Sequence, residues 1–322
     1  MAELPWSAPP IFVVGVGRSG TSLLQSMLAA HSLLAVPPET AFLRRFVAPR
    51  LLSRTHRRGG PEAVGNLLEG DERVRRLGLD LADILHGTNW QTRHLDRSIY
   101  ESLMAAYATA VAKPRFGDKD PRLIEYLPAV SCLWPAAFVI NVVRDPRDVV
   151  SSRLKADWAR QRPYWMHAFA YKVQMKLGRQ VGPALFGARY VEVHYEALVA
   201  RAEEELRSLC AAVHLEFEES MLSFQESARR LVASSELQWK RETMGPVLSG
   251  NVGKWKGTLS PTAVGVVEAA CQEMFGSGEY QPAMRAARGL SIRFFEWLYD
   301  GLALLYTCWR SFALWRRKWR CG

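Results

Sequence analysis

The stretch that most constrains the fold of this chain is Ile11–Leu28, with the sequence IFVVGVGRSGTSLLQSML. Its first residues form a short apolar run, which predicts a buried strand, and apolar residues return at helical spacing from Thr21. The glycines between them allow a tight loop without side chains. A strand, a glycine loop and a helix N-terminus in this order point unpaired amides and the positive end of the helix dipole at one place. We therefore expect an anion-binding cradle here, completed by the side chains of Arg18, Ser19, Thr21 and Ser22 and the backbone of Gly20.

The glycine loop partly fits two known patterns, and both stay open at this point. Read as GxGxxG, it matches a dinucleotide-binding fingerprint, and Glu39 lies near the expected distance of a ribose-binding acid, although Pro37 and Pro38 directly precede it. Read as GxxxxG, it is similar to a P-loop, but Thr21 occupies the position where nucleoside-triphosphate enzymes carry lysine. The third alternative is a plain turn.

A second strand–loop–helix unit begins at Ala137–Val143, whose sequence AFVINVV is apolar on both faces. Such a strand suits the centre of a parallel sheet. It leads into Arg144 and the sequence RDPRD, and then into a helix. Further short strands are expected at Leu33–Val36 and Tyr190–Val193, with helices between. Alternating strands and helices predict an α/β fold with a P-loop-like open, mostly parallel sheet flanked by helices.

Two polar stretches are expected to carry no regular structure. Residues 53–78 are rich in arginine and glycine, which favours a solvated, variable connection, with a substrate-facing lid as the alternative. Residues 116–121, FGDKDP, have the composition of a compact polar turn, with Pro121 placed to begin the following helix.

The overall composition limits the functional class only in part. The chain carries 42 Lys and Arg against 32 Asp and Glu, a net charge of +10, which favours an anionic ligand or surface. The five cysteines are widely spaced and are expected to be free thiols, and no signal peptide is visible. We therefore expect a cytoplasmic protein with no metal and no nucleic-acid partner.

Both strand-to-helix corners are similar to motifs of one family. GVGRSGTSLL resembles the 5′-phosphosulfate loop, and NVVRDPRDVVSS the 3′-phosphate motif, of the sulfotransferases that use 3′-phosphoadenosine 5′-phosphosulfate (PAPS). In the second motif of that family an arginine and a serine eight positions later hold the 3′-phosphate, and Arg144 and Ser152 keep this interval. The family's arginine shortly after that serine is replaced here by Ala156.

The resemblance is closest to the tyrosylprotein sulfotransferase branch and its bacterial relatives. It implies that Glu39 is the general base and that Lys119, in a K-D-P tripeptide, stabilises the transition state together with Arg18. It further implies that Tyr195 and Lys254 contact the nucleotide. Ser235 matches the second stabilising residue of that branch, although its distance from Lys254 along the chain is stretched.

The resemblance implies a sulfotransferase that moves a sulfuryl group from PAPS to an acceptor hydroxyl group. The acceptor is not readable from the sequence, and carbohydrate, lipid-linked, tyrosyl and small-molecule acceptors all stay open. The alternatives are a P-loop-like kinase, disfavoured by Thr21, and a nucleotide- or membrane-binding module without catalysis.

The chain divides into an N-terminal segment (1–10), a sulfotransferase domain (11–280) and a basic, Trp-rich helical tail (281–322). In the tail, polar residues recur on one side of an amphipathic helix and apolar residues on the other. A cluster of basic residues among tryptophans follows. Such a helix suits an anionic membrane surface, here through residues 290–320, but packing on its own domain and a homodimer contact are equally open.

Overall fold

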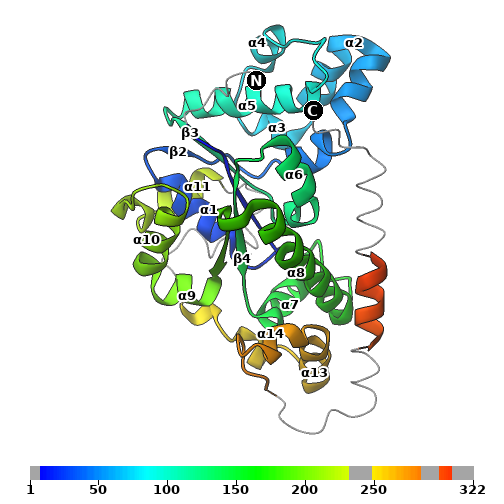
Figure 1. Ribbon diagram of the computed structural model, residues 1–322, viewed down its shortest axis with the longest axis vertical. Helices are drawn as coiled ribbons and strands as arrows, with labels where there is room; N and C mark the ends of the chain where they lie inside the picture. The colour runs from blue at the N-terminus through cyan, green and yellow to red at the C-terminus, as the bar shows by residue number, and fades with distance from the viewer. Residues whose placement is uncertain (1–7, 232–248, 284–296, 307–322) are drawn as a thin grey trace.

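The computed structural model describes residues 8–231, 249–283 and 297–306. Its centre is a five-stranded, all-parallel sheet with the order β2-β3-β1-β4-β5 (Figure 1). The strands are β1 (Ile11–Gly15), β2 (Leu34–Ala35), β3 (Arg115–Lys119), β4 (Phe138–Val143) and β5 (Tyr190–His194). The α/β fold with an open parallel sheet is therefore confirmed.

The two strands with the most apolar sequences occupy the middle of the sheet. Every residue of β1 and β4 is buried, as expected for parallel strands covered on both faces. Their register pairs Val13 with Ile140, and Val13 also lies opposite Lys119 of β3. The ends of β1, β3 and β4 are thus neighbours, which places the segments that follow them close together.

Helices cover both faces of the sheet (Figure 1). Phe12 and Val14 point into a core with α2 (Leu51–Glu69), α5 (Leu95–Ala110) and α6 (Leu127–Leu133). Ile11 and Val13, on the alternate face, pack against α1 (Thr21–Ala30), α10 (Ala202–Ala212) and α11 (Gln225–Leu231). The remaining regular helices of the described chain are α3 (Glu72–Arg75), α4 (Leu81–His86), α7 (Pro146–Leu154), α8 (Tyr164–Phe186), α9 (Tyr195–Ala200), α13 (Pro261–Ala270) and α14 (Gln272–Gly276).

The prediction of an unstructured connection over residues 53–78 is wrong. These residues form most of α2 and all of α3. Helix α2 is interrupted at Gly59 and Gly60, where Gly60 has a φ of 69°, and it resumes at Pro61. Three leucine and valine side chains bury one side of this arginine-rich helix against the core: Leu52, Val64 and Leu68.

The prediction of a polar turn over residues 116–121 is also wrong. Residues 115–119 form β3, an inner strand with all five residues buried. The strand tolerates charged side chains because each has a partner in the core. The Tyr100 hydroxyl donates to Asp118 at 2.8 Å, and Arg115 donates to the carbonyl oxygen of Val213 at 2.7 Å. Pro121 begins the 3-10 helix η2 (Pro121–Tyr126), as expected.

The described part of the tail, residues 297–306, is a helix that packs on α8 (red in Figure 1). Ala303 is buried against Val173 and Leu177, and Asp300 forms an ion pair with Lys172 at 2.6 Å. The side chains of Trp297, Leu302, Leu304 and Leu305 on this helix are exposed. The rest of the predicted amphipathic tail lies outside the described residues, and no helix in the described part of the chain is long and apolar enough to cross a membrane.

The cysteines only partly match the expectation of free thiols. Cys210 and Cys271 are free and buried, whereas Cys132 is disulfide-bonded. Burial raises the pKa of Cys210 to about 11, which keeps this thiol protonated at neutral pH.

Candidate functional site

The candidate site lies along the carboxyl edge of the sheet, where all five strands contribute. The loop of residues 16–20 follows β1, Glu39 follows β2, Lys119 ends β3, Arg144 follows β4 and Tyr195 follows β5. In open parallel sheets ligands bind at this edge. The structure brings the predicted site residues Arg18, Glu39, Lys119, Arg144 and Tyr195 to one edge of the sheet. Lys119 reaches it at the end of a strand and not in the turn expected for residues 116–121.

The loop after β1 has the geometry of an anion cradle. Gly20 caps α1 with a φ of 96°, and Arg18 also has a positive φ of 81°, so the backbone turns sharply before the helix begins at Thr21. The amide of Ser19 donates to the carbonyl oxygen of Val16 at 2.9 Å, which closes the turn. The first amides of α1 and the positive end of the helix dipole therefore point into the loop. Thr21 and Ser22 are the first two residues of this helix, so they lie at the same end.

The two arginine corners predicted from the sequence are in direct contact. Nη1 of Arg144 donates to the carbonyl oxygen of Arg18 at 3.0 Å, and Nε of Arg18 donates to the hydroxyl of Ser152 at 3.0 Å. The Arg144 guanidinium also lies 4.2 Å from the ring centroid of Tyr195. That ring in turn packs on Gly20, where an added Cβ would lie only 2.2 Å from it.

Three buried polar atoms at this edge have no hydrogen-bond partner within the described chain. They are Oγ of Ser19, Nε of Arg144 and Oδ1 of Asn251. Buried polar atoms are satisfied in the great majority of cases, so a group of unsatisfied ones calls for a specific explanation. The two donors suit phosphate or sulfate oxygens, and all three atoms lie beside the cradle, so the residues present fit a bound polyanionic nucleotide.

Glu39 and Lys119 form an ion pair next to the cradle. The Lys119 side chain is fully buried, whereas the side chain of Glu39 retains 21% of its exposure. Arg44 donates to Asp120 at 3.0 Å, and this pair fixes the residue after Lys119. Burial raises the pKa of Asp118, on the other side of Lys119, to about 6, even though the hydrogen bond from Tyr100 favours its ionised form. Lys119 is thus a buried residue at the carboxyl edge of the sheet, and it forms an ion pair with the partly exposed carboxylate of Glu39.

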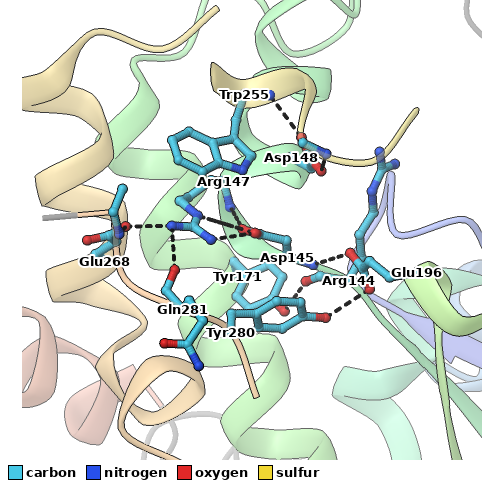
Figure 2. Close-up of polar contacts among 12 residues, drawn as sticks. Arg144, Asp145, Arg147, Asp148, Tyr171, Glu196, Trp255, Glu268, Tyr280 and Gln281 are labelled. Atoms are coloured by element: carbon cyan, nitrogen blue, oxygen red, sulfur yellow. Dashed lines mark hydrogen bonds and ion pairs between the residues drawn. The ribbon is translucent and has the colours of Figure 1, made fainter. Parts of the chain in front are cut away.

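The corner after β4 is held by a buried polar network (Figure 2). Arg147 donates to Asp145 at 2.7 Å through Nη2 and at 3.0 Å through Nε, and to Glu268 of α13 at 2.6 Å. Glu196 accepts a hydrogen bond from the Asp145 amide at 2.9 Å and another from the Tyr280 hydroxyl at 3.1 Å. The network therefore ties the RDPRD corner to α9, α13 and the segment after α14.

Of the predicted site residues Lys254 and Ser235, the structure describes only Lys254. Lys254 begins the 3-10 helix η8 (Lys254–Gly257), and its side chain is exposed beside the RDPRD corner. Its contact with the nucleotide stays a prediction. The segment around it reaches the corner, because Arg144 donates to the carbonyl oxygen of Asn251 at 2.6 Å. Ser235 lies outside the described residues.

Arg153 is a site residue that the sequence reasoning missed. Its Nε donates to the carbonyl oxygen of Gly17 at 3.1 Å, and only 6% of the residue is exposed. Burial, together with the charges of Arg122, Arg162 and Arg18, lowers its pKa to about 10. Its position directly after Ser152, on the buried face of α7, was the available signal. A buried cation on the loop adds to the positive potential of the cradle.

Comparison with known proteins agrees with this geometry. Residues 9–219 match the model of a family described as the sulfotransferase family. The chain is 25% identical over 268 residues to an uncharacterised protein of Aquifex aeolicus, covering 78% of this chain and 31% of that protein. It is 25% identical over 271 residues to the protein-tyrosine sulfotransferase of Drosophila melanogaster, covering 78% of this chain and 48% of that one. The chain thus spans less than two thirds of the length of either relative.

A solved structure shares the fold of this chain. The sulfotransferase domain of the olefin synthase from Synechococcus PCC 7002 superimposes with a TM-score of 0.63 at 22% identity. The match covers 85% of this chain and 96% of that domain.

Proposed function

Because the chain belongs to the sulfotransferase family, we propose that it transfers a sulfuryl group from PAPS to an acceptor hydroxyl group. The observation that carries this proposal is the direct contact between the two arginine corners. Arg144 reaches the backbone of Arg18, and Arg18 reaches Ser152, so both motifs belong to one site. PAPS carries a 3′-phosphate and a 5′-phosphosulfate on one nucleoside, so it needs two anion-binding sites that are neighbours.

The donor would be held by residues of both corners. The loop amides, Arg18, Ser19 and the start of α1 suit the 5′-phosphosulfate, because helix N-termini bind such anions without a metal. Arg144 and Ser152 suit the 3′-phosphate. The buried donors Ser19 Oγ and Arg144 Nε, which have no partner within the described residues, are the observation that supports this fit.

The ion pair of Glu39 and Lys119 supplies the chemistry on the acceptor side. Bound PAPS would supply the activated sulfuryl group. The Glu39 carboxylate, which is partly exposed, is positioned to accept the proton of an incoming hydroxyl group. The buried ammonium group of Lys119 and the guanidinium of Arg18 supply fixed positive charge where negative charge develops. Since Lys119 is held by the sheet, its charge is already in place and needs no reorganisation.

The proposed acceptor is a hydroxyl compound, and the candidate classes are tyrosyl, carbohydrate, lipid-linked and small-molecule acceptors. The curated relative from Drosophila acts on protein tyrosine by its name, but this chain spans only 48% of it.

The test is transfer of labelled sulfate from PAPS to an acceptor panel covering these four classes. We expect labelled product in at least one class, without added metal, and no Mg²⁺-dependent turnover of ATP. Turnover of ATP with no transfer from PAPS would contradict the proposal and favour the kinase alternative.

A further inference from the structure

Residues 249–257, which include η8, lie on the RDPRD corner through a small number of polar contacts (Figure 2). The Asp148 carboxylate accepts hydrogen bonds from the amides of Gly253 at 2.7 Å and Trp255 at 2.9 Å. Arg147 stacks on the Trp255 ring with its guanidinium carbon 4.1 Å from the ring centroid. Arg144 donates to the carbonyl oxygen of Asn251 at 2.6 Å.

The backbone of this segment depends on Asp148 for its position. Val252, Lys254 and Lys256 are exposed, so Trp255 is the main apolar anchor between residues 252 and 257. Gly253 has a φ of 75°, a left-handed conformation that turns its amide toward the carboxylate. Asp148 itself is only 2% exposed and sits in the first turn of α7, where an anion is favoured by the helix dipole.

The same segment helps to orient the Arg144 guanidinium through the carbonyl oxygen of Asn251. That guanidinium donates to the carbonyl oxygens of Arg18 and Asn251, one from the loop after β1 and one from this segment. These two hydrogen bonds occupy Nη1 and Nη2, so they fix the plane of the group and the direction of Nε. If the segment moves, the contact with Asn251 is lost, and only the Arg18 carbonyl oxygen and the Tyr195 ring still orient the guanidinium.

We propose that Asp148 is a positioning residue for recognition of the 3′-phosphate: it holds the amides of Gly253 and Trp255, which place the Asn251 carbonyl oxygen against Arg144. The proposal rests on the proposed function, since it assigns Arg144 to the 3′-phosphate of the donor. Asp148 itself contacts only the protein. It acts through the backbone of residues 251–255, which orients Arg144.

The test compares two nucleotides in the full-length chain by calorimetry: adenosine 3′,5′-bisphosphate and adenosine 5′-monophosphate, which lacks the 3′-phosphate. In the Asp148→Asn variant one acceptor oxygen is replaced by an amino group that meets a backbone N–H. We expect the preference for the bisphosphate to fall by about tenfold, the effect of one charge-assisted hydrogen bond. The affinity for the monophosphate should stay unchanged, because the loop after β1 does not depend on Asp148.

Asp96→Asn is the matched control. Asp96 is another buried carboxylate, 6% exposed, that accepts hydrogen bonds from two backbone amides, those of Leu52 at 2.8 Å and Ser53 at 3.2 Å. It caps the start of α2, away from the carboxyl edge. We expect this variant to lose thermal stability and to keep the full preference for the bisphosphate.

An unchanged preference in Asp148→Asn, with a wild type that does discriminate, would overturn the positioning role. A wild type that binds both nucleotides equally would instead overturn the assignment of the 3′-phosphate site in the proposed function. Hydrogen exchange of the wild type covers the case of a variant that does not fold. We expect the amides of Gly253 and Trp255 to gain protection with the bisphosphate and none with the monophosphate, and equal protection would also overturn the role.

Discussion

At the scale of single residues, the site is an arrangement of buried or half-buried charges that the fold keeps apart from water. Lys119 is fully buried and forms an ion pair with Glu39, and Arg153 is buried against the loop after β1. A buried charge is costly unless it is paired or serves a bound ion. The concentration of such groups at one sheet edge is therefore the clearest residue-level sign of function.

Removal of the candidate base should separate catalysis from binding. We expect Glu39→Gln to lower kcat by about 10²–10⁴-fold, the usual contribution of a general base. The affinity for adenosine 3′,5′-bisphosphate should change little, because the proposed mechanism assigns Glu39 to the acceptor hydroxyl group and not to the nucleotide. Steady-state kinetics and calorimetry on the same preparation check this. A normal kcat with lost nucleotide affinity would contradict the assignment.

Asp118 gives the fold a pH dependence of known sign. Burial raises its pKa to about 6 in the folded chain, from an ordinary value of 3.8. The contribution of this group to stability is therefore complete below pH 3.8 and is lost as the pH rises through about 6. Asp118→Asn removes the titration and keeps an acceptor for the Tyr100 hydroxyl. Denaturant unfolding should show that the variant gains stability relative to the wild type between about pH 4 and pH 7.5, by up to about 3 kcal/mol. Parallel pH profiles for the two proteins would contradict this.

At the scale of elements, the apolar strands and the glycine loop were predictable, and the polar strand was not. β1 and β4 have β-branched, apolar sequences that allow few other structures in a chain of this size. β3 is RFGDK, and its charged residues favour a turn when read locally. It is a strand because partners distant in sequence, such as Tyr100 and Val213, satisfy its side chains. The sequence of α2 also did not predict a helix, because its arginines and the glycines at the interruption, Gly59 and Gly60, are typical of a loop.

Some residues of the candidate site were likewise predictable from local sequence, and others were not. The spacing of Arg144 and Ser152, and the loop around Arg18, could be recognised from local motifs. Arg153, Asp148 and Asn251 could not, because their roles depend on segments more than 100 residues apart that only the fold brings together. Local sequence contains no information on such contacts unless an already known motif includes them.

Packing at the start of α1 gives a prediction for the loop as a unit. Gly20 has a φ of 96°, and a Cβ there would lie 2.2 Å from the ring of Tyr195. We expect Gly20→Ala to displace this ring and to strain the backbone by about 1–3 kcal/mol. Thermal melting should show a lower Tm, and calorimetry a weaker affinity for adenosine 3′,5′-bisphosphate. Gly276→Ala is the control, because a Cβ there meets nothing within 4 Å, so equal effects of the two changes would contradict this account.

At the scale of the whole molecule, the exposed apolar face of helix 297–306 stands apart from the site. Tyr299 and Ala303 bury one side of this helix on the domain, while 42% of Leu302 and 68% of Leu305 are exposed. The sequence that follows carries five basic residues within 310–320, namely Arg310, Arg316, Arg317, Lys318 and Arg320. Exposed apolar side chains followed in the sequence by clustered basic residues are typical of association with an anionic membrane surface.

We expect the full-length chain to co-sediment with vesicles that contain anionic lipid and not with neutral ones. A double variant, Leu302→Ser and Leu305→Ser, should reduce the bound fraction, because it removes exposed apolar surface and leaves the contacts of Tyr299 and Ala303 intact. Equal binding of the wild type and the double variant would contradict membrane docking through this face. A dimer that forms through the same leucines would instead appear as a change in sedimentation without vesicles.

The corners after β1 and β4 are proposed to bind the two ends of one nucleotide. A crystal structure of the chain with adenosine 3′,5′-bisphosphate tests this. We expect the loop amides and Arg18 to contact the 5′-phosphate, and Arg144 and Ser152 to contact the 3′-phosphate of the same molecule. A structure in which the nucleotide contacts only one corner, or in which Arg144 contacts no phosphate, would contradict it.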